Sequence, residues 1–191
     1  MNHKLALLIA LCYSFSACAY AEQKMAKKSR GHLVEKCLNV GKQYKPIYYI
    51  ATIGSEGTTL TTHDGTLWQV SEKTSHRAAQ WNEGESLIIS PNRDAFYRLS
   101  NKQRGEFVNA LISHGPSAEE TVRIEFIDYR HPYIRLTDGS RWGTKRSAEF
   151  STWEEEDIVL QGINRSLFGK PNVLINLTKS SNLLVGRYVD E

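Results

Sequence analysis

The sequence predicts an all-β protein made of two tandem small barrels or sandwiches, SH3-like or OB-like, with about five to six strands each, after a signal peptide. Three observations lead to this prediction. An apolar run stands near the start of the chain, an Asp-Gly turn followed by a tryptophan occurs twice, and short alternating or β-branched runs are bounded by turn residues. No long helical periodicity follows the apolar run.

The first 21 residues (1–21) are interpreted as a secretory signal peptide. Leu5–Phe15 is an uncharged apolar run after a short basic start, and Ala19-Tyr20-Ala21 fits the A-x-A cleavage pattern, so cleavage is expected after Ala21. As a helix this run rises only about 16 Å, too short for a bilayer core of about 30 Å. No later segment is apolar over the roughly 18 residues that a spanning helix needs, so we expect no transmembrane segment in the mature chain.

A second interpretation of the same region stays open. Phe15–Cys18 loosely resembles a bacterial lipoprotein box, in which Cys18 would become the lipidated first residue. Both interpretations predict export. Cleavage after Ala21 leads to the periplasm or to secretion, whereas acylation of Cys18 gives a lipid-anchored lipoprotein of the cell envelope.

The composition is that of an ordinary globular protein. Charged residues make up 24% and aromatic residues 10% of the 191 residues, which argues against disorder throughout. The formal net charge of +3 is small, so we expect no dedicated nucleic-acid binding. After cleavage at Ala21 the remaining cysteine is Cys37, which either packs as a small buried hydrophobe or links two chains through a disulfide.

The mature chain contains an internal repeat. Asp64 and Asp138 of the two Asp-Gly turns are 74 positions apart, as are Trp68 and Trp142, and Trp81 and Trp153 follow at a spacing of 72. Further on, "YRLSNK" from Tyr97 is matched with "LINLTK" from Leu174, and "VNAL" with "VGRY". These matches divide the chain into a basic leader or linker (22–45), a first β repeat (46–113), a linker (114–119) and a second β repeat (120–189).

Each repeat is expected to form about six short strands, because its alternating and β-branched runs are separated by turn residues. Residues 72–82 and 146–153 are polar and are expected to hold a turn of helix. The expected strands are 47–53, 58–63, 66–71, 86–90, 95–100 and 106–112 in the first repeat, and 121–127, 133–137, 140–145, 157–161, 172–178 and 182–188 in the second.

The repeated turn is predicted to be a three-residue hairpin loop, with Gly65 and Gly139 in the left-handed bulge position. A two-residue loop would place the following tryptophan among polar side chains. A three-residue loop places Trp68 with Leu60 and Val70, and Trp142 with Ile134 and Leu136, so both indoles become core residues.

Trp81 and Trp153 occupy equivalent positions in the polar arm of each repeat. Their recurrence favours a structural role, in which they pack this arm onto the barrel. The alternative is an exposed platform on which a sugar ring stacks.

The run D-G-[ST]-x-W, then W-x-x-G-[DE], then "YxLxN" and "VxAxL" resembles small β repeat domains of uncharacterised exported bacterial proteins, which we associate with Chlamydia-like and Legionella-like organisms. The resemblance covers residues 58–112 and is weaker over 133–188, where Glu156 replaces the glycine and "VGRY" replaces "VNAL". It implies a β fold and a bacterial source, and it carries no established activity.

The residue types that support catalysis or metal binding do not recur at equivalent positions. His63 lies beside Asp64, but Thr137 takes its place in the second copy, so an exposed turn histidine is the simpler interpretation. Glu154–Asp157 is an acidic run without the spacing of a calcium loop. No cofactor or metal site and no catalytic residue is therefore expected.

A binding face is the stronger functional candidate. Arg130, Tyr133, Arg135 and Arg141, with Tyr129 nearby, form a basic and aromatic set that only the second repeat has. The alternative is a charged outer strand that discourages edge pairing. We expect an exported, non-enzymatic binding or structural module of the bacterial cell envelope, with an unknown protein or an envelope glycan as partner. The alternative is a hydrolase or other enzyme with a site in the groove between the two repeats.

Overall fold

The computed structural model describes residues 44–92, 96–117, 119, 121–144, 146–165 and 170–188. All of these residues belong to one compact unit, Asn39–Glu191. The predicted signal peptide with Ala21 and Cys18, the leader up to residue 43, and Cys37 lie outside the described residues. Across the described ranges, none of the helices combines the length and the hydropathy needed to cross a membrane.

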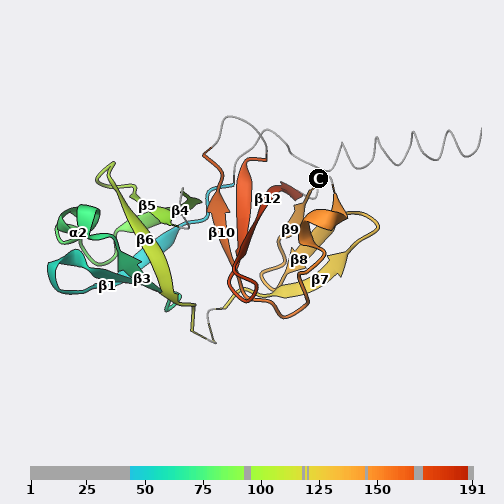
Figure 1. Ribbon diagram of the computed structural model, residues 1–191, viewed down its shortest axis with the longest axis horizontal. Coiled ribbons are helices and arrows are strands. Elements are labelled where there is room, and N and C mark those ends of the chain that lie inside the picture. The colour runs from blue at the N-terminus through green and yellow to red at the C-terminus, as the bar shows by residue number, and fades with distance from the viewer. Residues whose placement is uncertain are drawn as a thin grey trace, which may run out of the picture. The chain divides into compact units, whose positions relative to one another are not determined.

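The fold is nearly all β and consists of two small modules, as the sequence predicts (Figure 1). Module 1 is a closed six-stranded barrel with the strand order β1-β2-β3-β6-β5-β4. Helix α2 (Glu72–Ala78) joins β3 to β4, and the short helix η1 (Ser55–Gly57) joins β1 to β2. Its strands are β1 (Tyr48–Ile53), β2 (Thr59–Thr62), β3 (Leu67–Val70), β4 (Ser86–Pro91), β5 (Tyr97–Asn101) and β6 (Phe107–His114).

Module 2 repeats this plan in a six-stranded sheet with the order β7-β8-β9-β12-β11-β10. The helix η2 (Ser147–Phe150) takes the place of α2. Both edges of the sheet meet through an isolated bridge between Arg123 and Ile158. Its strands are β7 (Ile124–Asp128), β8 (Tyr133–Leu136), β9 (Arg141–Gly143), β10 (Val159–Ile163), β11 (Asn172–Asn176) and β12 (Ser181–Tyr188).

The two Asp-Gly turns are three-residue hairpin loops, as predicted. In module 1 the N–H of Thr62 donates to the carbonyl of Thr66, and Gly65 has a φ of 84°. In module 2 the N–H of Leu136 donates to Ser140 in the same way, and Gly139 has a φ of 79°. The left-handed glycine supplies the bulge that brings the following tryptophan onto the core side. Trp68 and Trp142 are accordingly buried.

The predicted register of the last two strands of the repeat is wrong by two residues. Leu87 pairs with Asn101, and its equivalent Val159 pairs with Asn176, so the spacing between β5 and β11 is 75 rather than 77. A slip of two residues keeps every side chain on the same face of a strand, because the pleat has a period of two. The apolar pattern therefore cannot detect this error, and the pairing of the strands decides it.

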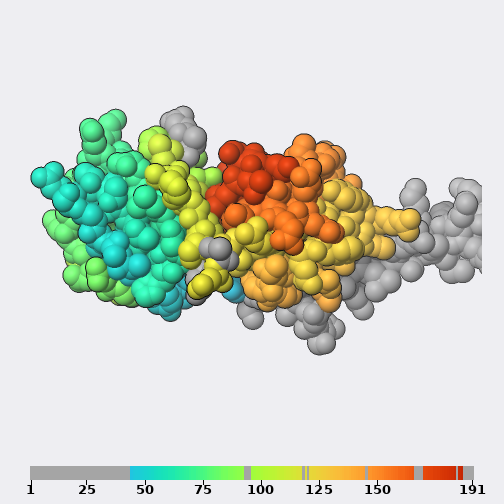
Figure 2. Space-filling model, turned by 90° about the horizontal axis from the view of Figure 1, so that it is seen from below, coloured from blue at the N-terminus to red at the C-terminus, as the bar shows by residue number. Residues whose placement is uncertain are grey.

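The two modules share part of their core. The buried cluster around Trp68 includes three side chains from strands of module 2, namely Leu160, Val173 and Ile175. Gly162 lies so close to β4 that a Cβ atom there would stand 2.9 Å from the carbonyl oxygen of Ile89. Strands β10 and β11 are thus buried on both faces, and the atoms of module 1 meet those of module 2 directly (Figure 2).

Tyr44, which precedes β1 and lies within the predicted leader (22–45), packs against the core of module 2. The ring of Tyr44 packs against this core and meets Trp142 edge-on, with 5.6 Å between ring centroids. Its N–H donates to Oδ1 of Asn172 (3.1 Å), and its carbonyl accepts from Nδ2 of the same side chain (2.5 Å). The amide of Asn172 therefore binds the backbone of Tyr44 as a neighbouring strand would.

Candidate functional site

The repeated Asp-Gly-[Ser/Thr]-x-Trp run has a structural explanation in both modules. Oδ1 of Asp64 accepts from the hydroxyl of Thr62 (2.6 Å), and that hydroxyl in turn accepts from the indole N–H of Trp68 (3.3 Å). In module 2, Oδ1 of Asp138 accepts from the hydroxyl of Ser140 (2.5 Å), which accepts from the indole N–H of Trp142 (2.7 Å). The carboxylate thus fixes the turn and orients the hydroxyl that accepts from the buried indole.

A second repeated arrangement joins a carboxylate to the asparagine that ends the fifth strand of each module. The side chain of Asn101 donates to Glu85 (2.6 Å), and the side chain of Asn176 donates to Asp157 (2.8 Å). Arg104 also donates to Glu85, at 2.9 Å, and this hydrogen bond lowers the pKa of Glu85 to about 2. These carboxylates are therefore held by structural partners within the fold.

Trp81 and Trp153 are buried, so neither forms an exposed platform for a sugar ring. The backbone N–H of Trp81 donates to Ala78, and that of Trp153 donates to Phe150, which places the two indoles in the same local geometry. The indole N–H of Trp153 donates to the hydroxyl of Ser181 at 2.9 Å. Both tryptophans anchor the helical arm of their module to its sheet.

The predicted binding face is brought together only in part. Arg135 and Arg141 are paired across β8 and β9, and Arg135 is also paired with Phe126 on β7. Nε of Arg135 lies 2.8 Å from a carboxylate oxygen of Glu125, and its guanidinium lies 5.7 Å from the centre of the Phe126 ring. Tyr133 packs beside the same ring, at 6.0 Å between centroids. We call Phe126, Tyr133, Arg135 and Arg141 the outer face of module 2.

Arg130 and Tyr129 lie apart from this outer face, on the turn between β7 and β8. The ring of Tyr129 stacks on Phe150, and its hydroxyl donates to the carbonyl of Trp153. The N–H of Arg130 donates to Asp128, whose pKa is lowered chiefly by a hydrogen bond from the backbone of His131. These contacts fix the turn.

Phe126 is the member of the outer face that the sequence pattern places wrongly. Strict alternation from Ile124 would place Phe126 on the core side. The pairing of β7 with β8 shifts by one residue between Ile124 and Phe126, as that of β1 with β2 does between Ile50 and Thr52. A bulge of this kind exchanges the faces of the strand beyond it. Ile127 is therefore buried and Phe126 is 37% exposed. Two consecutive apolar residues are the signal that could have revealed the bulge.

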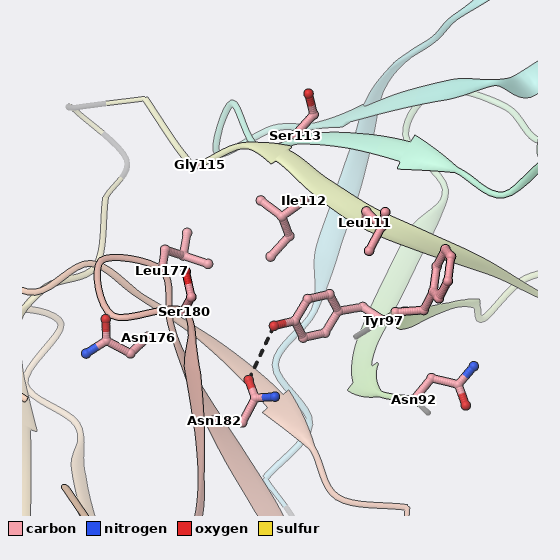
Figure 3. A pocket seen from close by; sticks show the side chains of 11 residues that line it. Asn92, Tyr97, Leu111, Ile112, Ser113, Gly115, Asn176, Leu177, Ser180 and Asn182 are labelled. Carbon is pink, nitrogen blue, oxygen red and sulfur yellow. Dashed lines mark hydrogen bonds between the residues drawn. The ribbon is translucent and has the colours of Figure 1, made fainter. Parts of the chain in front are cut away.

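A groove forms the second candidate site, between β6 of module 1 and the turn that joins β11 to β12 (Figure 3). Its volume is about 510 Å³, which is within the range of ligand pockets. The side chains of Tyr97, Ile112 and Leu177 project into it, and those of Ser180 and Asn182 line its walls. None of the described residues that line this groove carries a charge.

The described residues do not assemble a metal centre: no three of their histidine, cysteine, aspartate or glutamate side chains lie close enough together to hold an ion. The histidines at 63, 76, 114 and 131 are all exposed. His131 and Asp128 form a pair on the turn between β7 and β8, with 3.0 Å between Nδ1 and Oδ2.

Comparisons with protein-family models, with curated proteins and with solved structures find no match for this chain. The resemblance of its motifs to exported bacterial repeat domains therefore stays a prediction.

Proposed function

We propose that the chain is an exported, non-enzymatic binding module of the bacterial cell envelope, and that the outer face of module 2 contacts an anionic envelope glycan. The observation that carries this proposal is the difference between two copies of one scaffold. Where module 2 has Phe126, Arg135 and Arg141 in register across three strands, module 1 has the neutral side chains of Thr52, Thr61 and Leu67.

The scaffold alone does not account for this difference. Both modules have the same strand order and the same bulge, and module 1 folds with uncharged side chains at these positions. Phe126 is 37% exposed, and an outward position contributes less apolar burial than a core position. An aromatic ring and guanidinium groups on one face suit a ligand that has both a flat apolar surface and negative charge.

Arg135 forms an exposed ion pair with Glu125, and such a ligand could take the place of Glu125 in this pair. The side chains of this pair are 39% and 46% exposed, and an exposed ion pair contributes at most about 1 kcal/mol. A carboxylate or sulfate of the ligand can therefore replace Glu125 at the guanidinium, with which it can form two parallel hydrogen bonds. The ring of Phe126 below Arg135 keeps the guanidinium plane in place.

The test is titration of the mature protein with polygalacturonate, an anionic glycan, and with neutral dextran. Arg135→Gln together with Arg141→Gln is expected to weaken binding of polygalacturonate by about tenfold, since two exposed charge contacts are lost. The matched control, Lys73→Gln with Lys102→Gln, removes the same charge from exposed positions of module 1 and is expected to leave the affinity within about twofold.

Two results would contradict the proposal. Equal loss of affinity in both double variants would mean that net charge, and not the outer face, attracts the polymer. Release of reducing sugar ends during the titration would mean that the protein is an enzyme. Fractionation of native cells tests export separately, because the proposal requires the protein in the envelope or the medium.

A further inference from the structure

The groove between the two modules has fixed walls, and both walls belong to one shared core. On the module 1 side, the ring of Tyr97 meets Trp68 edge-on at 5.9 Å, and Ile112 is paired with Trp68 across β6 and β3. On the module 2 side, the N–H of Leu177 donates to the carbonyl of Ile158 at 2.8 Å. The hydroxyl of Tyr97 donates across the groove to Oδ1 of Asn182, at 3.3 Å. The site is therefore preorganised.

The groove combines an apolar floor with neutral polar walls. Tyr97, Ile112 and Leu177 all pack against the shared core and form the floor. Among the described residues, the amide nitrogen of Asn182 and the hydroxyl of Ser180 have no hydrogen-bond partner. These groups supply both donors and acceptors at the rim of an apolar surface.

The lack of charge among the described residues that line the groove decides which class of ligand fits. A charged ligand would lose hydration here without gaining an opposite charge, which is costly. A neutral ligand with hydroxyl groups at its edge and C–H groups on its face loses little, because the amide and hydroxyl side chains replace its water. An uncharged sugar ring has this division of its surface.

The topology argues against an extended peptide as the ligand. Peptides that bind to β proteins commonly add a strand to a free sheet edge. The wall formed by module 1 is a closed barrel, and closure removes such edges. Recognition in this groove thus has to come from side chains.

We propose that this groove binds a segment of an uncharged oligosaccharide, with sugar rings lying on Tyr97, Ile112 and Leu177 and their hydroxyls bonded to Asn182 and Ser180. This inference goes beyond the proposed function, because it concerns a different surface and a neutral ligand. The two sites together would allow one chain to hold a neutral and an anionic part of the envelope.

The experiment is NMR titration of the mature protein with tetramers of N-acetylglucosamine, of glucose and of galactose at millimolar concentration. At least one of them is expected to shift the backbone amides of Ile112, Leu177 and Asn182. Asn182→Ala is expected to weaken that tetramer by about tenfold, because its exposed amide can no longer bond the sugar. Gln69→Ala is the matched control: Gln69 is also an exposed strand amide with one hydrogen bond, outside the groove.

Each outcome either supports or overturns sugar binding in the groove. Absence of shifts at the groove with all three tetramers overturns the inference, as does an equal loss of affinity in Asn182→Ala and Gln69→Ala. Binding of an uncharged hexapeptide at the groove without any binding of sugar also overturns it. The Arg135→Gln with Arg141→Gln variant is expected to bind the tetramer normally, so failure of this inference is distinguishable from failure of the proposed function.

Discussion

In module 1 the ring that meets Trp68 edge-on comes from Tyr97 of the same module, whereas in module 2 the ring that meets Trp142 comes from Tyr44, which precedes β1. The position equivalent to Tyr97 is Asn172, whose side chain binds the backbone of Tyr44 instead. One copy thus supplies its own aromatic partner, and the other takes it from the chain that leads into its neighbour.

A second contact of the same kind involves Tyr48. Its hydroxyl accepts from the backbone N–H of Gln161 and donates to the carbonyl of that residue, both at 2.9 Å. The phenol therefore satisfies the backbone of Gln161 in the middle of β10. The sheet of module 2 is closed before this point, by the bridge between Arg123 and Ile158. In module 1 strands β1 and β4 close the barrel by direct pairing. The comparison teaches that the second copy depends on residues outside its own repeat.

The largest expected effect comes from the two core indoles. Trp68→Ala and Trp142→Ala are each expected to destabilise the protein by about 3–5 kcal/mol, the usual cost of truncating a buried tryptophan. Because the modules share a core, both variants are expected to lower one common unfolding transition. Calorimetry checks this: two separate transitions, with only one of them shifted by each variant, would show that the copies are independent.

Replacement of Tyr44 tests whether module 2 depends on a residue outside its own repeat. Tyr44→Ala is expected to cost about 2–3 kcal/mol, because it exposes one edge of Trp142 and removes a half-buried ring. Urea unfolding measures the loss. Lys45→Ala is the control, since its side chain is exposed and adjacent in the chain. Equal stability of the two variants would mean that the segment before β1 is not part of the core of module 2.

Gly162 tests the close contact between β10 and β4. Gly162→Ala is expected to cost about 1–3 kcal/mol, because its Cβ would crowd the backbone of Ile89 and a methyl of Val173 at 2.9 Å each. The strands must then separate, so we also expect unfolding to become less cooperative. A stability equal to that of the unmodified protein, measured by urea unfolding, would mean that the modules can move apart at no cost.

A smaller effect comes from a position with left-handed backbone conformation that is glycine in module 1 and glutamate in module 2. Gly84 has a φ of 80°, and its equivalent Glu156 has a φ of 70°. Glu156→Gly is therefore expected to stabilise the protein by about 1 kcal/mol, since a non-glycine residue in this region is strained. Glu155→Gly is the control without positive φ, and it should not stabilise. Thermal unfolding compares the two variants.

The smallest effect concerns acid stability. The pKa of Glu85 falls from 4.5 to about 2, chiefly through its hydrogen bond with Arg104. Its contribution is therefore complete above pH 4.5 and is lost as the pH falls towards 2. Glu85→Gln should lower stability by at most about 1 kcal/mol at neutral pH and flatten the decline in this window. In module 2 the residue equivalent to Arg104 is Lys179, which pairs with Glu154, a side chain that is 72% exposed. Glu154→Gln should therefore change neither quantity measurably.

Much of each module could be predicted from local pattern. The strands, the three-residue loops and the inward tryptophans follow from alternation and from the chemistry of Asp-Gly, because these depend on neighbours close in sequence. The outer face was predicted only in part. Arg135 and Arg141 were found from their parity, whereas Phe126 was missed because a bulge reverses the faces of β7.

The sequence by itself determined that the chain has two copies of one β unit, the type of its repeated turn and the side of the sheet on which each indole lies. Tertiary structure alone decided the two-residue register of β11, the burial of β10 and β11 on both faces, and the place of Tyr44 beside Trp142. The physical reason is the range of the interactions. A turn and a pleat are set within a few residues, whereas the contact between Tyr44 and Asn172 joins positions far apart in the chain, and no periodicity records which distant groups will meet.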